Sequence, residues 1–238
     1  MRRKQFVLLA VIFYTAVLPA VSAQMESDAK VQYPDPARFE EEILDFEAAD
    51  KINMPSEGAI VCTGSSSMRI WHTTIAGDLN PLTIIPRGFG GSNMNDLLYF
   101  TDRVVIKYKP RAVVIYQGDS DIDSGISPAR VRDMFIEFTS KVHSRLPQTR
   151  IYFLSLKPSV VRWNMWPKKI AANALIADVC ENDSRLTFLD VSTPMLDSSG
   201  NIRKDIFLKD DNHMNESGYK IWTGVVRPVL IKNEIKYE

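Results

Sequence analysis

Five short apolar runs alternate along the chain with longer segments whose apolar residues recur at helical spacing. The runs cover residues 59–63, 82–85, 112–116, 151–156 and 186–189. Each is continuous rather than alternating, which is typical of strands covered on both faces of a parallel sheet. The helical patterns cover residues 36–51, 93–109, 128–146, 166–180 and 215–232. This alternation predicts an α/β fold, a three-layer α/β/α sandwich around a five-stranded parallel sheet.

Two of the helical patterns carry end signals. Ser127 stands immediately before Pro128, so it is predicted as the N-cap of a helix whose first position is the proline. Pro228 lies inside the last pattern and predicts a kink or an end there.

The first residues have the pattern of an export signal. Three basic residues at positions 2–4 precede an apolar run over residues 6–20, and Val21-Ser22-Ala23 offers small residues to a signal peptidase. We therefore predict a signal peptide over 1–23, a flexible lead-in over 24–35 and one domain over 36–238. An uncleaved anchor is the alternative, but the apolar run is short for a membrane span. The expected protein is secreted or periplasmic, with no stable membrane anchor after cleavage.

Charge and composition exclude several function classes. The 238 residues include 29 basic and 29 acidic side chains, so loss of the three basic residues at positions 2–4 leaves a net charge of −3. No basic cluster with interleaved aromatic residues is found, and nucleic acid is not an expected partner.

Cys62 lies in a strand pattern and Cys180 in a helical one, so two free buried thiols are favoured over a disulfide. No His/Cys set has metal-ligand spacing, and no metal or cofactor is expected.

Candidate chemistry gathers in four loops that follow predicted strands. These loops are residues 64–67, 87–93, 117–121 and 209–215. In open parallel sheets, ligands bind at the carboxyl ends of the strands, where such loops meet. The first loop places three serines after Gly64, and one of them is a candidate nucleophile. The alternative for these serines is helix capping, which is the commoner role of serine at such a position.

A serine nucleophile needs a base, and the chain has three histidines. His143 lies among charged residues of a helical pattern and is expected on the surface. His72 is a weak candidate because of its proximity to the serine loop. His213 follows Asp210 by three residues, so one loop can bring a carboxylate and an imidazole together. By itself this spacing is also common at helix starts.

The glycine-rich loop after the second strand has two interpretations. It lacks the Gly-x-x-x-x-Gly-Lys pattern, and position 93 is Asn rather than the third glycine of a dinucleotide-binding turn. Its backbone N–H groups are suited to binding an oxyanion. A glycine turn without a chemical role is the alternative. The absence of a Gly-x-Ser-x-Gly elbow excludes the α/β-hydrolase plan.

Taken in order, the four loops resemble the SGNH (GDSL-type) hydrolase family. The matching blocks are residues 60–67, 89–92, 114–121 and 210–213. The chain is most similar to an exported branch whose first block reads Gly-Ser-Ser-Ser. The resemblance implies the flavodoxin-like fold of that family and a serine ester hydrolase.

The family assigns roles residue by residue. Ser66 corresponds to the nucleophile, whose N–H also donates to the oxyanion, and the N–H of Gly91 is a second donor. His213 corresponds to the base and Asp210 to its orienting acid. Ser120 stands where the family has an asparagine whose side chain is the third oxyanion donor.

Two residues depart from the family pattern. Ser65 replaces an aspartate, a change that the Gly-Ser-Ser-Ser branch shares, and Ser120 replaces the oxyanion asparagine. A serine hydroxyl is shorter and is expected to reach the oxyanion only through water. Loss of one donor costs about 3–4 kcal/mol of transition-state stabilisation. The alternative function is therefore a catalytically impaired protein of the same fold that binds glycan or lipid.

The resemblance implies small acyl esters as substrates, either O-acetylated glycans or lysophospholipid and other lipid esters. Trp163 and Trp166 are candidates for stacking a sugar or shielding an acyl chain, with ordinary packing at a helix start as the alternative. Arg162 and Lys157 are candidates for an anionic group, although a solvated role is favoured for both. Transfer of the acyl group to a sugar instead of water is a third possibility.

Overall fold

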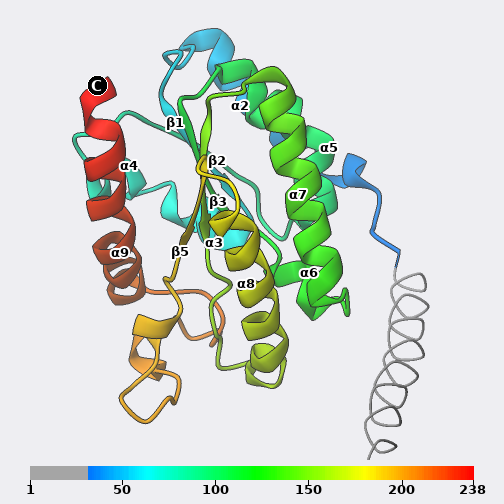
Figure 1. Ribbon diagram of the computed structural model, residues 1–238, viewed down its shortest axis with the longest axis vertical. Helices are drawn as coiled ribbons and strands as arrows, with labels where there is room; N and C mark the ends of the chain where they lie inside the picture. The colour runs from blue at the N-terminus through cyan, green and yellow to red at the C-terminus, as the bar shows by residue number, and fades with distance from the viewer. Residues whose placement is uncertain (1–31) are drawn as a thin grey trace, which may run out of the picture.

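The computed structural model describes residues 32–238, in which five parallel strands form a single sheet (Figure 1). The strands are β1 (Ile60–Gly64), β2 (Ile84–Gly88), β3 (Ala112–Tyr116), β4 (Arg150–Leu154) and β5 (Leu186–Leu189). Their spatial order is β2-β1-β3-β4-β5, and every pair is parallel. This is the order of flavodoxin-like folds, in which β2 is added on one side of β1 and the later strands are added on the other side. The predicted fold class is confirmed.

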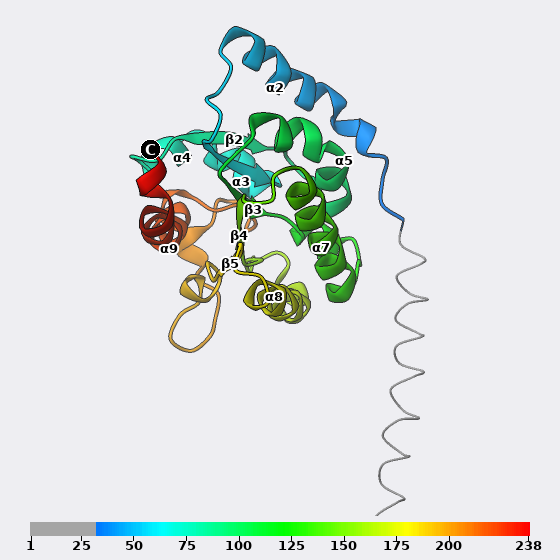
Figure 2. The ribbon, with the colours of Figure 1, turned by 45° about the horizontal axis from the view of Figure 1, so that its top comes forward.

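Helices cover both faces of the sheet. The α-helices are α2 (Glu40–Ile52), α3 (Ser66–Trp71), α4 (Ile75–Asp78), α5 (Met94–Val104), α6 (Asp119–Asp123), α7 (Pro128–Arg145), α8 (Trp166–Glu181) and α9 (Glu216–Glu234). Helices α5, α7 and α8 lie on one side of the sheet, and α4 and α9 lie on the other (Figures 1 and 2). Helix α2 follows the short 3₁₀ helix η1 (Pro36–Phe39) and lies outside these layers, above α5 and the β2 edge in Figure 2.

The apolar runs form the core because both faces of the sheet are covered. Val61 of β1 is paired with Ile85 of β2 on one side and with Val113 of β3 on the other, and all three are buried. Burial of one such side chain stabilises the fold by about 1.5–3 kcal/mol. The edge strand β2 is different because it also buries Arg87, which pairs with Asp50 of α2.

The structure refines several predicted boundaries. Strand β2 begins two residues later than predicted and extends through Pro86 to Gly88. The helix predicted over 93–109 ends at Val104 and is followed by a short 3₁₀ turn. Ser127 accepts a hydrogen bond from the N–H of Arg130, as an N-cap does, whereas α9 continues through Pro228 to Glu234 rather than ending there. The short helices α3, α4 and α6 lie in segments for which no helical range was predicted.

The predicted signal peptide over 1–23 lies outside the described residues. Within the predicted lead-in, the Tyr33 hydroxyl donates to Asp121 at 2.7 Å, so packing against the domain begins inside the segment that we expected to be flexible. Cys62 and Cys180 are free and buried, as predicted. Among residues 32–238, no helix has the length and apolar character needed to cross a membrane.

Candidate active site

The serine loop turns sharply at the carboxyl end of β1. Gly64 has φ +138°, and a Cβ there would lie 2.0 Å from the carbonyl oxygen of Tyr116 in the neighbouring strand. Only glycine allows this close approach of two backbones. The turn makes Ser66 the first residue of α3, where the N–H groups have no partner inside the helix.

Three of the predicted site residues form a continuous chain of contacts. Ser66 Oγ lies 2.9 Å from His213 Nε2, and His213 Nδ1 lies 2.5 Å from Asp210 Oδ2. A carboxylate can only accept hydrogen bonds, so Nδ1 carries the hydrogen. In the neutral ring, Nε2 is then the acceptor that faces the Ser66 hydroxyl. The arrangement has the geometry of a nucleophile, a base and an orienting acid.

Asp210 is held as an anion by its own loop. Burial alone would raise its pKa, but hydrogen bonds from the His213 ring and from the backbone N–H groups of His213 and Asn212 lower it to about 2. The loop closes on itself through a bond from the Leu208 N–H to the His213 carbonyl at 2.8 Å. The carboxylate therefore stays charged at neutral pH and can orient the imidazole.

Residues after β4 hold this loop from beneath. The N–H groups of Val160 and Val161 both donate to the Asp211 carbonyl, at 2.9 and 3.2 Å. Lys157 Nζ donates to the Asn212 carbonyl at 2.7 Å. The favoured solvated role of Lys157 is wrong, because its side chain is buried beneath the loop, with 1% of the residue exposed. Burial lowers its pKa to about 8.

The glycine block, residues 89–92, follows β2 and is tied to the first loop. The Phe89 N–H donates to the Gly64 carbonyl at 2.9 Å, and the Gly88 N–H donates to His72 Nε2 at 2.8 Å. Burial and nearby arginines lower the pKa of His72 to about 4, so its neutral ring serves as an acceptor. His72 therefore supports the turn and does not contact Ser66. Gly91 has φ +79°, a conformation that favours glycine, and is exposed.

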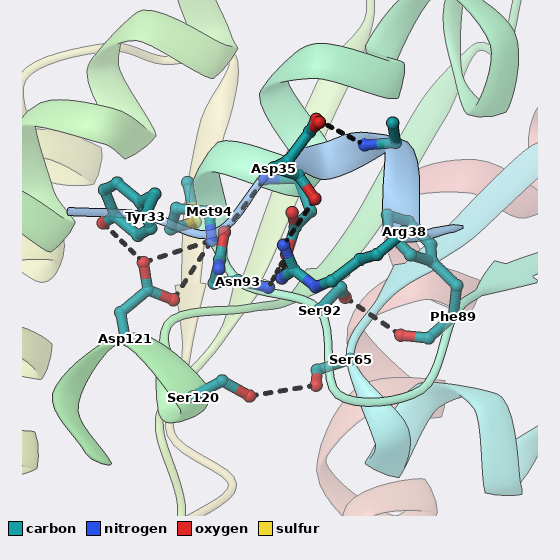
Figure 3. A network of polar contacts seen from close by, with 12 residues as sticks. Tyr33, Asp35, Arg38, Ser65, Phe89, Ser92, Asn93, Met94, Ser120 and Asp121 are labelled. Carbon is teal, nitrogen blue, oxygen red and sulfur yellow. Dashed lines mark hydrogen bonds and ion pairs between the residues drawn. The ribbon is translucent and has the colours of Figure 1, made fainter. Parts of the chain in front are cut away.

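The third block leads from β3 into α6. Ser120 is half-buried, and its Oγ lies 3.4 Å from the Oγ of Ser65. The two residues that depart from the family pattern are therefore in contact with each other (Figure 3). Two short hydroxyls occupy the place where the family has a carboxylate and an amide.

A cluster of charged side chains, of which Asp119 and Lys169 are buried, lies beside the third block. Asp119 pairs with Lys169 of α8, and Asp123 pairs with Arg162. Burial would raise the pKa of Asp119, but the positive charges of Lys169 and Lys157 outweigh it and lower that pKa. Burial and the neighbouring Asp119 raise the pKa of Asp123. The cluster fixes Arg162 at the rim of the site.

A depression of about 420 Å³ opens above these residues. It is lined by Glu42, Ser66, Arg69, Ile70, Gly90, Gly91, Asp119, Ser120, Arg162, Asn212 and His213. Of the side chains in this lining, only Ile70 is aliphatic, so the depression favours polar ligands. A second depression, of about 430 Å³, shares Ile70 and adds the apolar side chains of Leu208, Met214 and Tyr219.

The predicted tryptophans do not line the depression that holds Ser66. Trp163 and Trp166 stack on each other with ring centroids 6.2 Å apart, and Trp163 is 39% exposed. Arg162 is the one member of this predicted group that reaches the site. His143 is half-buried on α7 and contacts the Thr149 carbonyl, away from the site. Among residues 32–238, no group of three or more potential metal ligands is arranged around a common point.

Comparison with known families places this geometry in context. Residues 57–221 match the GDSL-like Lipase/Acylhydrolase family over more than half of the chain. The chain belongs to this family. The match supports a hydrolase of the acylhydrolase type, and it begins only after the N-terminal helix α2. No curated protein sequence matches the chain.

Solved structures share the fold at low sequence identity. A protein from Streptococcus pneumonia, provisionally named as a platelet activating factor, is 18% identical with a TM-score of 0.70, over 91% of this chain and 99% of that one. A GDSL-like lipase from Bacteroides thetaiotaomicron is 18% identical with a TM-score of 0.67, over 83% and 98%. A catalytic mutant of an acetylxylan esterase from Geobacillus stearothermophilus is 13% identical with a TM-score of 0.60, over 77% and 96%.

Proposed function

We propose that this protein is an exported serine ester hydrolase that acts on small acyl esters through Ser66, His213 and Asp210. The observation that carries the proposal is the unbroken line from Ser66 Oγ through the His213 ring to Asp210, at 2.9 and 2.5 Å, in the floor of an open depression. Family membership supports the acylhydrolase class. Export rests on the signal-peptide pattern of residues 1–23.

The proposed reaction has two halves. Ser66 Oγ attacks the ester carbonyl while His213 Nε2 takes its proton, and the carbonyl oxygen becomes an oxyanion. The N–H groups of Ser66 and Gly91 donate to that oxyanion. His213 then returns the proton to the departing alcohol, which leaves an acyl group on Ser66. Water, deprotonated by the same imidazole, releases the acid and restores the serine.

The polar lining favours a short acyl group on a polar carrier, such as an O-acetylated glycan. Arg69 and Arg162 bring two guanidinium groups to the rim, and Arg162 is held there by Asp123. Lipid or lysophospholipid esters are the competing substrates, because the adjacent depression beyond Ile70 is more apolar. Trp163, which follows Arg162 in the chain, presents an exposed ring outside this depression that suits stacking on a sugar.

One observation favours a second function, a binding protein that has lost efficient catalysis. Ser120 lacks the amide that the family uses as the third oxyanion donor, and its hydroxyl faces Ser65. Such a protein would hold an ester in the same depression without turning it over.

Activity on p-nitrophenyl esters and labelling by a fluorophosphonate test the proposal. We expect turnover of p-nitrophenyl acetate, covalent labelling of Ser66, and a loss of at least about a thousandfold in kcat for Ser66→Ala. Ser67→Ala is the matched control, since Ser67 is the next residue of the same helix and is expected to keep the activity. Preference for acetyl over octanoyl esters would support the short acyl group. No turnover and no labelling of the folded wild type would overturn the hydrolase in favour of the binder.

A further inference from the structure

The segment Tyr33–Asp50, here called the N-terminal strap, lies before the residues that match the family, yet it contacts the glycine block. The ring of Phe39 meets the ring of Phe89 edge-on, with centroids 5.2 Å apart. Glu42 reaches the depression and lies 3.4 Å from the Gly90 N–H, which donates to it. The strap therefore covers one side of the loop that carries the proposed oxyanion donor Gly91.

Two buried carboxylates, Asp121 and Asp96, connect the strap to this loop, and Figure 3 shows the contacts of Asp121 with Tyr33 and Met94. Both oxygens of Asp121 accept from the Met94 N–H at 3.1 Å, and Oδ1 also accepts from the Tyr33 hydroxyl at 2.7 Å. Asp96 Oδ2 accepts from the Asn93 N–H at 2.9 Å and pairs with Arg38. Neither aspartate has any exposed surface. Each carboxylate thus takes one backbone N–H from the loop and one donor from the strap.

These contacts bear on the direction of the Gly91 amide. Asn93 and Met94 follow Gly91 by two and three residues, and Gln117 of the third block donates to the Ser92 carbonyl at 2.6 Å. Gly91 has no side chain that could fix its own orientation, so its neighbours set it. Asp121 also stands next to Ser120, which means that one Tyr33 hydroxyl supports both the glycine block and the third block.

We propose that Tyr33 and Arg38 are positioning residues for the oxyanion donors, acting through Asp121 and Asp96. Neither side chain lines the depression, so neither is expected to touch substrate. The proposal rests on the proposed function, since an oxyanion forms only if the protein performs acyl transfer. It assigns a role in the site to residues outside the family match.

The role predicts a change in pH dependence. Burial and the neighbouring Asp96 raise the pKa of Asp121, the donors Tyr33 and Met94 N–H oppose the rise, and the resulting pKa is about 7. Tyr33→Phe removes a donor to the charged form, so the pKa of Asp121 increases. As the pH is lowered, Asp121 then becomes protonated at a higher pH than in the wild type and no longer holds the Met94 N–H as an anion. The pH below which kcat falls is therefore expected to rise.

The test combines kinetics with hydrogen exchange on the full chain. For Tyr33→Phe we expect kcat to fall about tenfold with KM nearly unchanged, because a hydrogen bond to a buried charge is lost while the substrate contacts stay. Exchange of the backbone amides in residues 89–95 is expected to accelerate. Arg38→Met is expected to act in the same direction through Asp96. The control is Tyr99→Phe, which alters an exposed tyrosine of α5.

The outcomes separate this proposal from the proposed function. Absence of turnover and labelling in the wild type refutes the hydrolase and with it any role toward an oxyanion, whereas exchange in residues 89–95 still shows whether the strap orders the glycine block. Unchanged exchange in residues 89–95 of both variants refutes the positioning role, whatever the kinetics show. A fall in kcat without any shift of the acid limb in Tyr33→Phe also refutes it, because a purely structural loss would leave that limb in place.

Discussion

The two halves of the candidate active site are built on opposite plans. The proton-relay half consists of side chains, two of them on an open loop, where the Asp210 side chain is 47% exposed and that of His213 is 25% exposed. The proposed oxyanion half consists of the backbone amides of Ser66 and Gly91, and Asp96 and Asp121, which anchor the loop that carries Gly91, are completely buried. The same site therefore combines an exposed relay with a buried frame.

The difference follows from what each half must orient. A side chain can be aligned by its own hydrogen bonds, and the bonds among Ser66, His213 and Asp210 do so within the relay. A backbone amide has no rotamer, so its direction is fixed only by the chain on either side. Buried side chains such as Asp96 and Asp121 hold that part of the chain in place, which explains why hydrogen bonds converge on residues 89–96. The departures from the family pattern, Ser65 and Ser120, also fall in the oxyanion half.

The largest expected effect comes from breaking the relay half at Asp210. Asp210→Asn removes the charge that stabilises the imidazolium and allows the wrong ring tautomer, so kcat/KM is expected to fall by about a thousandfold or more. Steady-state kinetics on p-nitrophenyl acetate measure the loss. Asp211→Asn is a matched control, because Asp211 is exposed, has φ +56°, and asparagine accepts that conformation. A loss of less than about threefold would mean that Asp210 does not orient His213 in the reaction.

A gain of function would sharpen the comparison on the oxyanion side. Ser120→Asn restores the amide that the family carries, and we expect kcat to rise about tenfold or more with KM little changed. Ser120→Ala separates the amide from the mere loss of a hydroxyl and is expected to show no gain. If both variants match the wild type in kcat and remain equally stable to heat, the third donor is not needed and the oxyanion is held by backbone amides alone.

The sequence was informative where a pattern is local. The five apolar runs located all five strands, and the four blocks located Ser66, Asp210 and His213, which the structure brings into contact. Strand β2 was misplaced because Pro86 and Arg87 are typical of loops. Burial of Arg87 depends on Asp50, 37 residues earlier, and no local pattern carries that information. Helices α3 and α6 are too short for a periodicity to appear.

The residues that support the site show no local sequence pattern from which their contacts could be predicted. Tyr33 meets Asp121 across 88 positions, and Lys157 meets the Asn212 carbonyl across 55. A lysine after a strand is usually solvated, and a tyrosine in a polar, proline-bearing segment suggests a linker. Only the fold brings each donor to its acceptor. The residues that meet at the site were therefore predictable from motifs, whereas their supporting contacts were not.

Lys157 offers the smallest predicted effect and a separate way to disturb the relay half. Lys157→Met keeps much of the buried volume but removes the bond to the Asn212 carbonyl, so the His213 loop loses one of its supports from beneath. We expect kcat to fall about fivefold to tenfold, as for loss of one hydrogen bond from a charged donor. Lys168→Met, an exposed neighbour of the buried Lys169, serves as the control.

Stability against pH separates this role from general damage to the fold. Burial holds the pKa of Lys157 at about 8, below its ordinary value of 10.5, so between these two pH values the unfolded chain binds more protons than the folded one. The free energy of unfolding contributed by this group therefore rises with pH across that window and declines as pH falls through about 8. Lys157→Met removes the rise, and urea unfolding at pH 8 and 10 measures the change. If kcat falls while the pH slope of stability stays as in the wild type, Lys157 is not the buried cation beneath the loop, and the relay half depends on its own hydrogen bonds alone.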